Sequence, residues 1–274
     1  MATVAGACIR PEPHRDVLSG TPRAHAIDRW IFVFMAAWFI AIVLAGFIPD
    51  SLMKIELVRT GQRPPFPLVL HAHAVLMGSF LLVLLLQTWL MATGRSAQHK
   101  QVGMLAIILA AALVIVGIIL VPTMYHARWD IAQAGPAGVR EQLLGKLGVV
   151  EDVILLQIRQ GVLFPLFLVI GLNARGQDAG LHKRMMFLAT AMPLTAGIDR
   201  ISWLPSTMPT SPTGGEVFIL LAILPMFLWD VFRNRSIHRA YVIWLAVNVP
   251  FAIFVHGLWD KPWWHQTARH IMGV

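Results

Sequence analysis

The sequence predicts an all-α integral membrane protein, a bundle of about seven transmembrane helices. Apolar residues make up 57% of its 274 positions, charged residues only 13%, and the mean hydropathy is +0.67. Charged residues make up about 25% of an average soluble domain. The apolar residues also fall into runs long enough to cross a hydrocarbon core of about 30 Å. These runs define the predicted helices.

Residues 1–29 are polar and are predicted to form a cytoplasmic tail. The segment contains Pro11, Pro13 and Pro22, and its apolar residues do not recur at helical spacing. The first apolar run begins only at Trp30. We therefore expect no cleavable signal sequence.

The predicted membrane domain covers residues 30–257 and contains seven apolar runs. The fifth run is interrupted by Pro193 and the Asp199-Arg200 pair, and the seventh is short and contains Pro250. The predicted spans are 30–47, 67–91, 102–124, 149–172, 185–204, 216–232 and 241–255.

Two further segments are predicted to lie at the outer membrane surface. Residues 136–148 carry apolar side chains at helical spacing, which predicts an amphipathic helix on the outer surface. This helix is expected to cover the site formed by the outer histidines described below. Residues 258–274 form an interfacial C-terminal tail, in which Trp259, Trp263 and Trp264 make an aromatic belt.

The distribution of basic residues predicts that the N-terminus is inside and the C-terminus outside. The predicted inner segments hold twelve Lys and Arg residues, and the outer segments hold eight. The inner residues are Arg10, Arg15, Arg23, Arg29, Arg95, Lys100, Arg175, Lys183, Arg184, Arg233, Arg235 and Arg239. This scatter between apolar runs fits a membrane protein, and the net charge of +8 does not predict nucleic-acid binding.

Histidines gather at the predicted outer ends of the helices. His71 and His73 open the second helix, His126 closes the third and His256 closes the seventh. Ionisable residues in hydrocarbon are functional candidates, and imidazoles bind haem iron and transition metals. The predicted ligand set is His71 or His73 with His256, and His126 joins it only if its helix tilts.

The spacing of His71 and His73 leaves two arrangements open. Residues two apart on a regular helix point about 200° away from each other. Either the two imidazoles bind two different partners, or the start of the helix after Pro67 is unwound and both converge on one metal. The run from His71 to Gly78, His-Ala-His-Ala-Val-Leu-Met-Gly, resembles the helix of haem–copper oxidase subunit I in which two histidines ligate two different haems. The resemblance implies that both are axial haem ligands, although the chain lacks the adjacent His-His pair of that family's copper site.

A broader succession of motifs is similar to a group of uncharacterised bacterial polytopic membrane proteins. It comprises His71-x-His73, Gln87, Gly94-Arg95 with His99-Lys100, His182-Lys183-Arg184-Met185 before Ala189-Thr190, and Arg200. This similarity implies a membrane fold in a bacterial inner membrane and leaves the reaction open.

Arg159 lies about ten residues below the outer end of the fourth helix, where an unpaired charge costs several kcal/mol. One interpretation is a buried clamp to Asp152 or Asp199. The other is that Arg159 and Arg200 line a polar cavity and bind a haem propionate or a lipid-like anionic substrate.

Three inner turns repeat a histidine followed by a basic residue, at His99, His182 and His238. Like-built turns indicate duplication of a two-helix unit. We expect these histidines to be interfacial residues among basic neighbours, and keep a second metal or haem site as the alternative.

Three function classes remain open. The first is a membrane oxidoreductase with haem b or histidine-bound iron or copper, held near the depth in the membrane at which a quinone would bind. The second is a zinc-dependent membrane hydrolase or lipid-modifying enzyme, with Asp199 or Asp152 as general base. The third is a non-enzymatic subunit or transporter. The single cysteine, Cys8, excludes an iron–sulfur cluster, and the sequence leaves the oligomeric state open.

Overall fold

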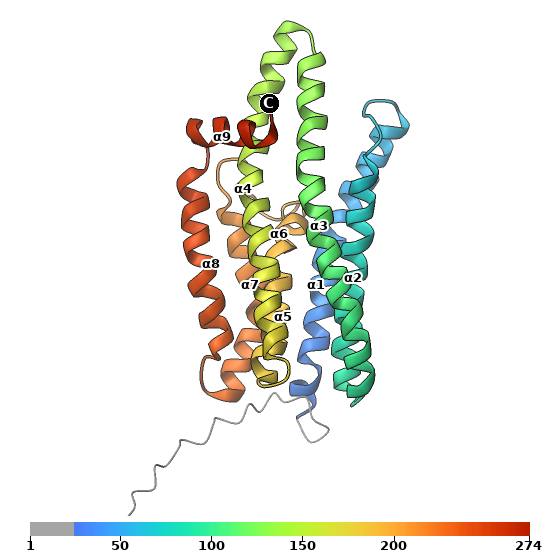
Figure 1. Cartoon of the computed structure of the whole chain (residues 1–274), viewed down its shortest axis with the longest axis vertical. Helices are drawn as coiled ribbons and strands as arrows, with labels where there is room; N and C mark the ends of the chain where they lie inside the picture. Colours follow the sequence, from blue (N-terminus) through green and yellow to red (C-terminus); the bar gives the residue numbers. More distant parts are fainter. Residues whose placement is uncertain (1–24) are drawn as a thin grey trace, which may run out of the picture.

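The structure is a computed structural model that describes residues 25–274, and this part of the chain contains helices and no strands. Six helices are long and apolar enough to cross a membrane (Figure 1). They are α1 (Ala26–Arg59), α2 (Leu68–Ala92), α3 (Ser96–Ala134), α4 (Ala137–Ala174), α7 (Thr213–Asn234) and α8 (Arg239–Leu258).

The fifth apolar segment is a broken helix. It consists of α5 (Ala179–Ala191), the 3₁₀ turn η1 (Met192–Leu194) and α6 (Thr195–Ile198). Pro193 lies in η1, where a proline cannot donate the backbone hydrogen bond that a continuous helix needs. No residue from 180 to 198 is exposed, so this segment is enclosed by the other helices. A seventh continuous span is not confirmed.

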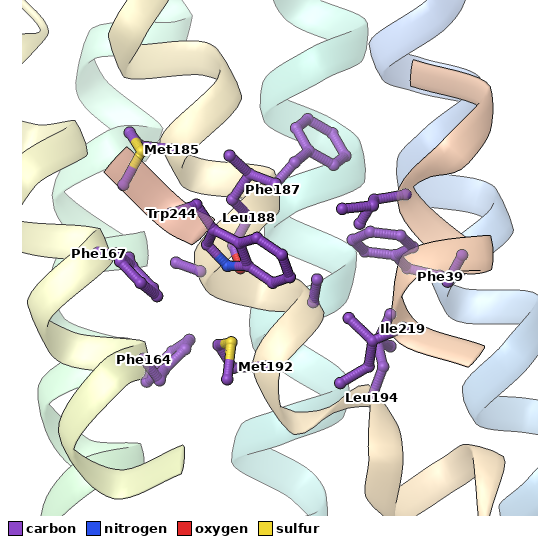
Figure 2. Packing of buried hydrophobic residues seen from close by; sticks show 14 of the residues in the cluster. Phe39, Phe164, Phe167, Met185, Phe187, Leu188, Met192, Leu194, Ile219 and Trp244 are labelled. Atoms are coloured by element: carbon purple, nitrogen blue, oxygen red, sulfur yellow. The ribbon is translucent and has the colours of Figure 1, made fainter. Parts of the chain in front are cut away.

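The apolar core is built around this broken helix (Figure 2). Phe187 on α5 meets the ring of Phe39 on α1 edge to face, and the indole N–H of Trp244 on α8 donates to the carbonyl oxygen of Leu188 at 3.1 Å. Side-chain packing of this kind is what holds helices together in lipid. It fixes α5 between α1, α4 and α8.

Helix α1 approaches α6 with no side chain between them. A Cβ atom added at Gly46 would overlap the backbone carbonyl of Gly197, and one added at Gly197 would lie 3.3 Å from the Cα atom of Val43. Only glycine permits this approach. The two glycines thus position the end of the broken helix against α1.

Charged side chains inside the bundle are paired. Arg184 on α5 binds both carboxylate oxygens of Asp230 on α7, and these side chains are 0% and 1% exposed. Asp28 on α1 is buried and accepts from Arg233 at 2.7 Å and from the indole of Trp229 at 2.9 Å. Helix α1 begins at Ala26, within the segment 1–29 predicted as a cytoplasmic tail, and residues 1–24 of that segment lie outside the described part.

The two ends of the bundle differ. At the end where α1 begins, here called the N-terminal end, α2, α4 and α7 finish and α3, α5 and α8 start (Figure 1). At the opposite end, α9 (Pro262–Met272) lies across the tops of α8 and α4, and the α3–α4 hairpin extends beyond it. Residues 136–148 were predicted to form a separate surface helix, but from Ala137 onwards this segment is the first part of continuous α4. The helix that lies across the bundle is α9.

Candidate functional site

The four outer histidines do not form one cluster. His71 and His73 lie on α2 and His256 lies on α8, and these two helices are on opposite sides of the bundle (Figure 1). His71 and His256 are exposed, whereas His73 and His126 are half-buried. Within residues 25–274, the only group of three or more metal-ligating side chains is Asp152, Asp260 and His265.

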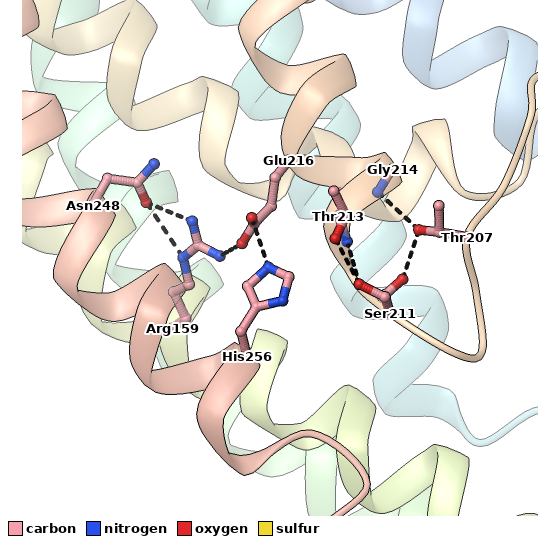
Figure 3. A network of polar contacts seen from close by, with 8 residues as sticks. All are labelled: Arg159, Thr207, Ser211, Thr213, Gly214, Glu216, Asn248 and His256. Atoms are coloured by element: carbon pink, nitrogen blue, oxygen red, sulfur yellow. Dashed lines mark hydrogen bonds and ion pairs between the residues drawn. The ribbon is translucent and has the colours of Figure 1, made fainter.

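His256 instead belongs to a polar network that joins three helices (Figure 3). Its Nε2 lies 3.0 Å from Glu216 Oε2, and the other carboxylate oxygen of Glu216 binds Arg159. Arg159 also donates to Asn248 Oδ1 at 2.9 Å. The clamp predicted for Arg159 therefore exists, but its partners are Glu216 on α7 and Asn248 on α8, and not Asp152 or Asp199.

The loop before α7 holds Glu216 in place. The backbone N–H of Gly214 donates to Thr207 Oγ1 at 2.8 Å, and Thr207 Oγ1 donates to the carbonyl oxygen of Ser211 at 2.7 Å (Figure 3). These bonds close the loop directly before Glu216 in the first turn of α7. The Arg159 network is thus fixed from both the loop and the helices.

The space around Arg159 and Asp199 is small. A cavity of about 10 Å³ is lined by these residues, Gln160, Thr195 and Glu216, among others. That volume is at the lower limit for a single water molecule.

Arg200, the third predicted catalytic residue, lies 3.3 Å from Asp50 and stacks over the ring of Phe47 at 4.6 Å. The arginines thus have protein partners.

A much larger cavity lies at the N-terminal end. Its volume is about 1610 Å³, and it extends between α2, α3, α4 and α5. Apolar side chains such as Phe80, Leu84 and Met186 line its walls. Five basic residues also line it, against one acidic residue, Asp178, which accepts from Arg239. The basic residues are Arg29, Lys100, Arg175, Lys183 and Arg239.

His99 on α3 and His182 on α5 both line this cavity and lie together. Their ring centres are 6.4 Å apart, and the ring planes cross at 81°. Both residues lie in the first turn of their helices, and α3 and α5 start at the same end of the bundle. The chain therefore brings the two imidazoles into one layer.

Each ring is oriented by a backbone carbonyl on the preceding helix. Nδ1 of His99 lies 3.3 Å from the carbonyl oxygen of Gln87 on α2, and Nδ1 of His182 lies 2.8 Å from that of Gly171 on α4. A carbonyl can only accept, so Nδ1 carries the proton in both rings. Nε2 is then the basic nitrogen of each ring, free to bind an electrophile.

Gln87 adds a buried polar group to the same cavity. Its side chain is 8% exposed, and its Oε1 has no hydrogen-bond partner within the described residues. A buried amide oxygen without a partner costs about 1–3 kcal/mol. An oxygen of this kind in a cavity wall is suited to accept from a bound molecule.

The sequence identified the members of this site but not its importance. The repeated His-basic turns were interpreted as interfacial, because sequence position alone does not show that two turns face each other. The pairing of Arg184 with Asp230 was missed altogether. The signal for it was present, since Asp230 interrupts the apolar run 216–232.

No protein-family model matches the chain, and no curated protein or solved structure matches it.

Proposed function

We propose that this chain is a membrane electron-transfer protein that binds haem b between His99 and His182. The proposal rests on one observation: two imidazoles with oriented Nε2 atoms lie together in the wall of the large cavity. A haem supplies reversible one-electron chemistry at its iron. The surrounding side chains then bind the macrocycle, exclude water and tune its potential.

The distance between the rings supports this ligand pair. An ion bound at about 2 Å by one nitrogen from each of two rings separates the ring centres by about 6 Å. The rings of His99 and His182 are 6.4 Å apart. The separation of the rings therefore matches that of a ligand pair, and the edge-to-face orientation requires one ring to turn before both Nε2 atoms face one ion.

The number of ligands favours haem over a free ion. Most transition-metal ions in proteins, zinc above all, take four or more ligands. The described residues supply no third His, Cys, Asp or Glu within reach of the pair. Haem brings four nitrogens of its own and needs only two axial ligands from the protein.

The orientation of the rings supports the same conclusion. A metal-binding histidine usually donates its other ring N–H to a carbonyl or a carboxylate, which fixes the ring and makes it a better ligand. Gln87 and Gly171 provide such carbonyls for His99 and His182.

The lining of the cavity is complementary to an amphipathic anion. Apolar walls suit the porphyrin face, and the basic residues at the helix ends suit the two propionates. Lys100 and Lys183 directly follow the two histidines in the sequence, so a positive charge accompanies each ligand.

The expected orientation, with the N-terminus inside, opens this cavity towards the cytoplasm. The twelve basic residues of the predicted inner segments favour this topology. The haem would then exchange electrons with a cytoplasmic donor or a quinone of the bacterial inner membrane. His71, His73, His126 and His256 have no role as ligands in this proposal.

Titration of the full-length protein in detergent with ferric haem tests the proposal. Wild type is expected to bind one haem per chain with a Soret band. His99→Ala and His182→Ala are each expected to weaken binding at least about tenfold, since each removes an axial ligand. His71→Ala, an exposed residue on α2, is the matched control and is expected to bind like wild type.

Two results would overturn the proposal. One is wild-type protein that takes up no haem. The other is loss of haem in His71→Ala or His256→Ala with full binding in His99→Ala and His182→Ala, which would return the site to the opposite end of the bundle.

A further inference from the structure

A second polar cluster lies at the opposite end of the bundle, where α9 crosses α4. Asp152 comes from α4, Asp260 from the turn before α9, and His265 from α9. One ligand atom from each side chain lies within 4.8 Å of the others. The cluster is therefore built from two separate segments that meet only in the folded chain.

The two carboxylates of this cluster have no Lys or Arg partner in the described part of the chain. Asp152 contacts His265 Nε2 at 3.2 Å and accepts from the backbone N–H of Asp260 at 3.0 Å. Its side chain is only 4% exposed. The buried carboxylate of Asp152 thus lies beside the exposed carboxylate of Asp260, and two like charges repel each other unless a cation lies between them.

We propose that Asp152, Asp260 and His265 bind one Zn²⁺ ion and that this ion fastens α9 to α4. Carboxylate oxygens and an imidazole nitrogen are ligands that zinc accepts. Three protein ligands leave the fourth tetrahedral position to water or to another molecule. This site is separate from the haem cavity and goes beyond the electron-transfer role proposed above.

The distance between two of the ligand atoms fits a zinc ion. Ligands bound at about 2.0 Å at the corners of a tetrahedron are about 3.3 Å apart. Asp152 Oδ1 and His265 Nε2 are 3.2 Å apart. A zinc ion can therefore bind both atoms with little rearrangement.

Glu151 supplies an independent sign of a metal-binding histidine. Its side chain is 0% exposed, and its Oε2 has no hydrogen-bond partner within residues 25–274. This oxygen lies 4.0 Å from Nδ1 of His265, on the edge of the ring opposite Asp152. Carboxylate, histidine and metal in this order form a common arrangement, in which Nδ1–H donates to the carboxylate and Nε2 binds the ion.

The surrounding contacts place α9 where a metal would hold it. The indole N–H of Trp264 donates to the carbonyl oxygen of Glu151 at 2.8 Å, and Arg269 donates to Glu151 Oε1 at 2.8 Å. Trp264 and Ala268 are buried against Ile154 and Leu155. The ion would add metal coordination to these links between α9 and α4.

Zinc titration of the full-length protein with a competing chelator tests this inference. Wild type is expected to bind one Zn²⁺ per chain, and His265→Gln and Asp260→Asn are each expected to bind at least about tenfold more weakly. Asp260 is exposed, and its side chain makes no hydrogen bond within the described residues, so Asp260→Asn should fold normally. His270→Gln, an exposed histidine on the same helix, is the matched control and should bind like wild type.

Cobalt absorbance provides a second measurement. Co²⁺ in place of Zn²⁺ is expected to give visible bands of tetrahedral coordination that His265→Gln loses. Equal zinc affinity in wild type, His265→Gln and Asp260→Asn would overturn the inference, as would wild type that binds no zinc.

A double variant separates the two proposals. His99→Ala with His182→Ala is expected to lose haem and to keep its zinc. Conversely, His265→Gln is expected to lose zinc and keep its haem.

Discussion

His99 and His182 lie edge to face, with ring centres 6.4 Å apart, in the wall of a cavity of about 1610 Å³. The Nδ1–H of each ring donates a hydrogen bond to a backbone carbonyl oxygen on the preceding helix. Both imidazoles are thus held by neighbouring helices as well as by their own. The site depends on the packing of four helices, so a change in that packing should alter the positions of the two rings.

The contact between α1 and α6 should not tolerate a methyl group. Gly46→Ala places a Cβ atom on the backbone carbonyl of Gly197, which cannot move without shifting a helix. We expect a thermal midpoint at least about 5 °C lower, a shift typical of a loss of a few kcal/mol. Gly78→Ala on α2, with no atom within 4 Å of the added Cβ, should leave the midpoint unchanged or raise it. Equal midpoints for the two variants would refute this contact.

Burial should separate the effects of two ion pairs. Arg184→Met leaves the carboxylate of Asp230 buried without its partner, which typically costs about 3–5 kcal/mol. Arg239→Gln breaks the bond to Asp178, but the Arg239 side chain is 62% exposed and such pairs contribute about 0–1 kcal/mol. Denaturation of both variants in the same detergent measures the difference. A loss of stability in Arg239→Gln as large as that in Arg184→Met would contradict the account.

The Arg159 network should behave as a coupled unit. Arg159→Met leaves Glu216 without its guanidinium partner, and we expect a loss of up to about 3 kcal/mol because Glu216 retains some exposure to solvent. The double variant Arg159→Met/Glu216→Gln removes both charges and should be more stable than Arg159→Met alone. A double-mutant cycle measures the coupling. Strict additivity would show that the two side chains do not interact.

Asp178 should stabilise the start of α5 in a pH-dependent way. Burial alone would raise the pKa of Asp178, but hydrogen bonds from the Leu181 N–H and Arg239 lower it below its usual range. Because the folded pKa is lower, the stabilisation is present above the unfolded pKa of about 3.9 and is lost as the pH falls through the folded value. Asp178→Asn should therefore be less stable than wild type at pH 6, and the difference should shrink below about pH 4. A difference that stays constant from pH 6 to pH 3 would exclude this role.

The sequence predicted the helical membrane class and the positions of most apolar segments because hydropathy is a local property. Six of these segments are long helices in the structure. The break at Pro193 was visible, but the enclosure of α5 by its neighbours depends on tertiary packing. The same holds for histidines: His71 and His73 form a conspicuous local pattern, whereas His99 and His182 meet only because two helices start at one end of the bundle.

Side-chain partners were the least predictable feature. Arg159 was expected to pair with Asp152 or Asp199 on grounds of depth and face. Its partners, Glu216 and Asn248, lie far along the chain on α7 and α8. Depth in the membrane restricts which residues can pair with a buried charge, but only the arrangement of the helices selects among them.

Electron paramagnetic resonance of the oxidised, haem-loaded full-length protein tests the central claim most directly. Two axial imidazoles predict a low-spin ferric signal in wild type, and loss of that signal in both His99→Ala and His182→Ala. A high-spin signal in wild type, or a low-spin signal that survives in either variant, would contradict the proposed ligand pair.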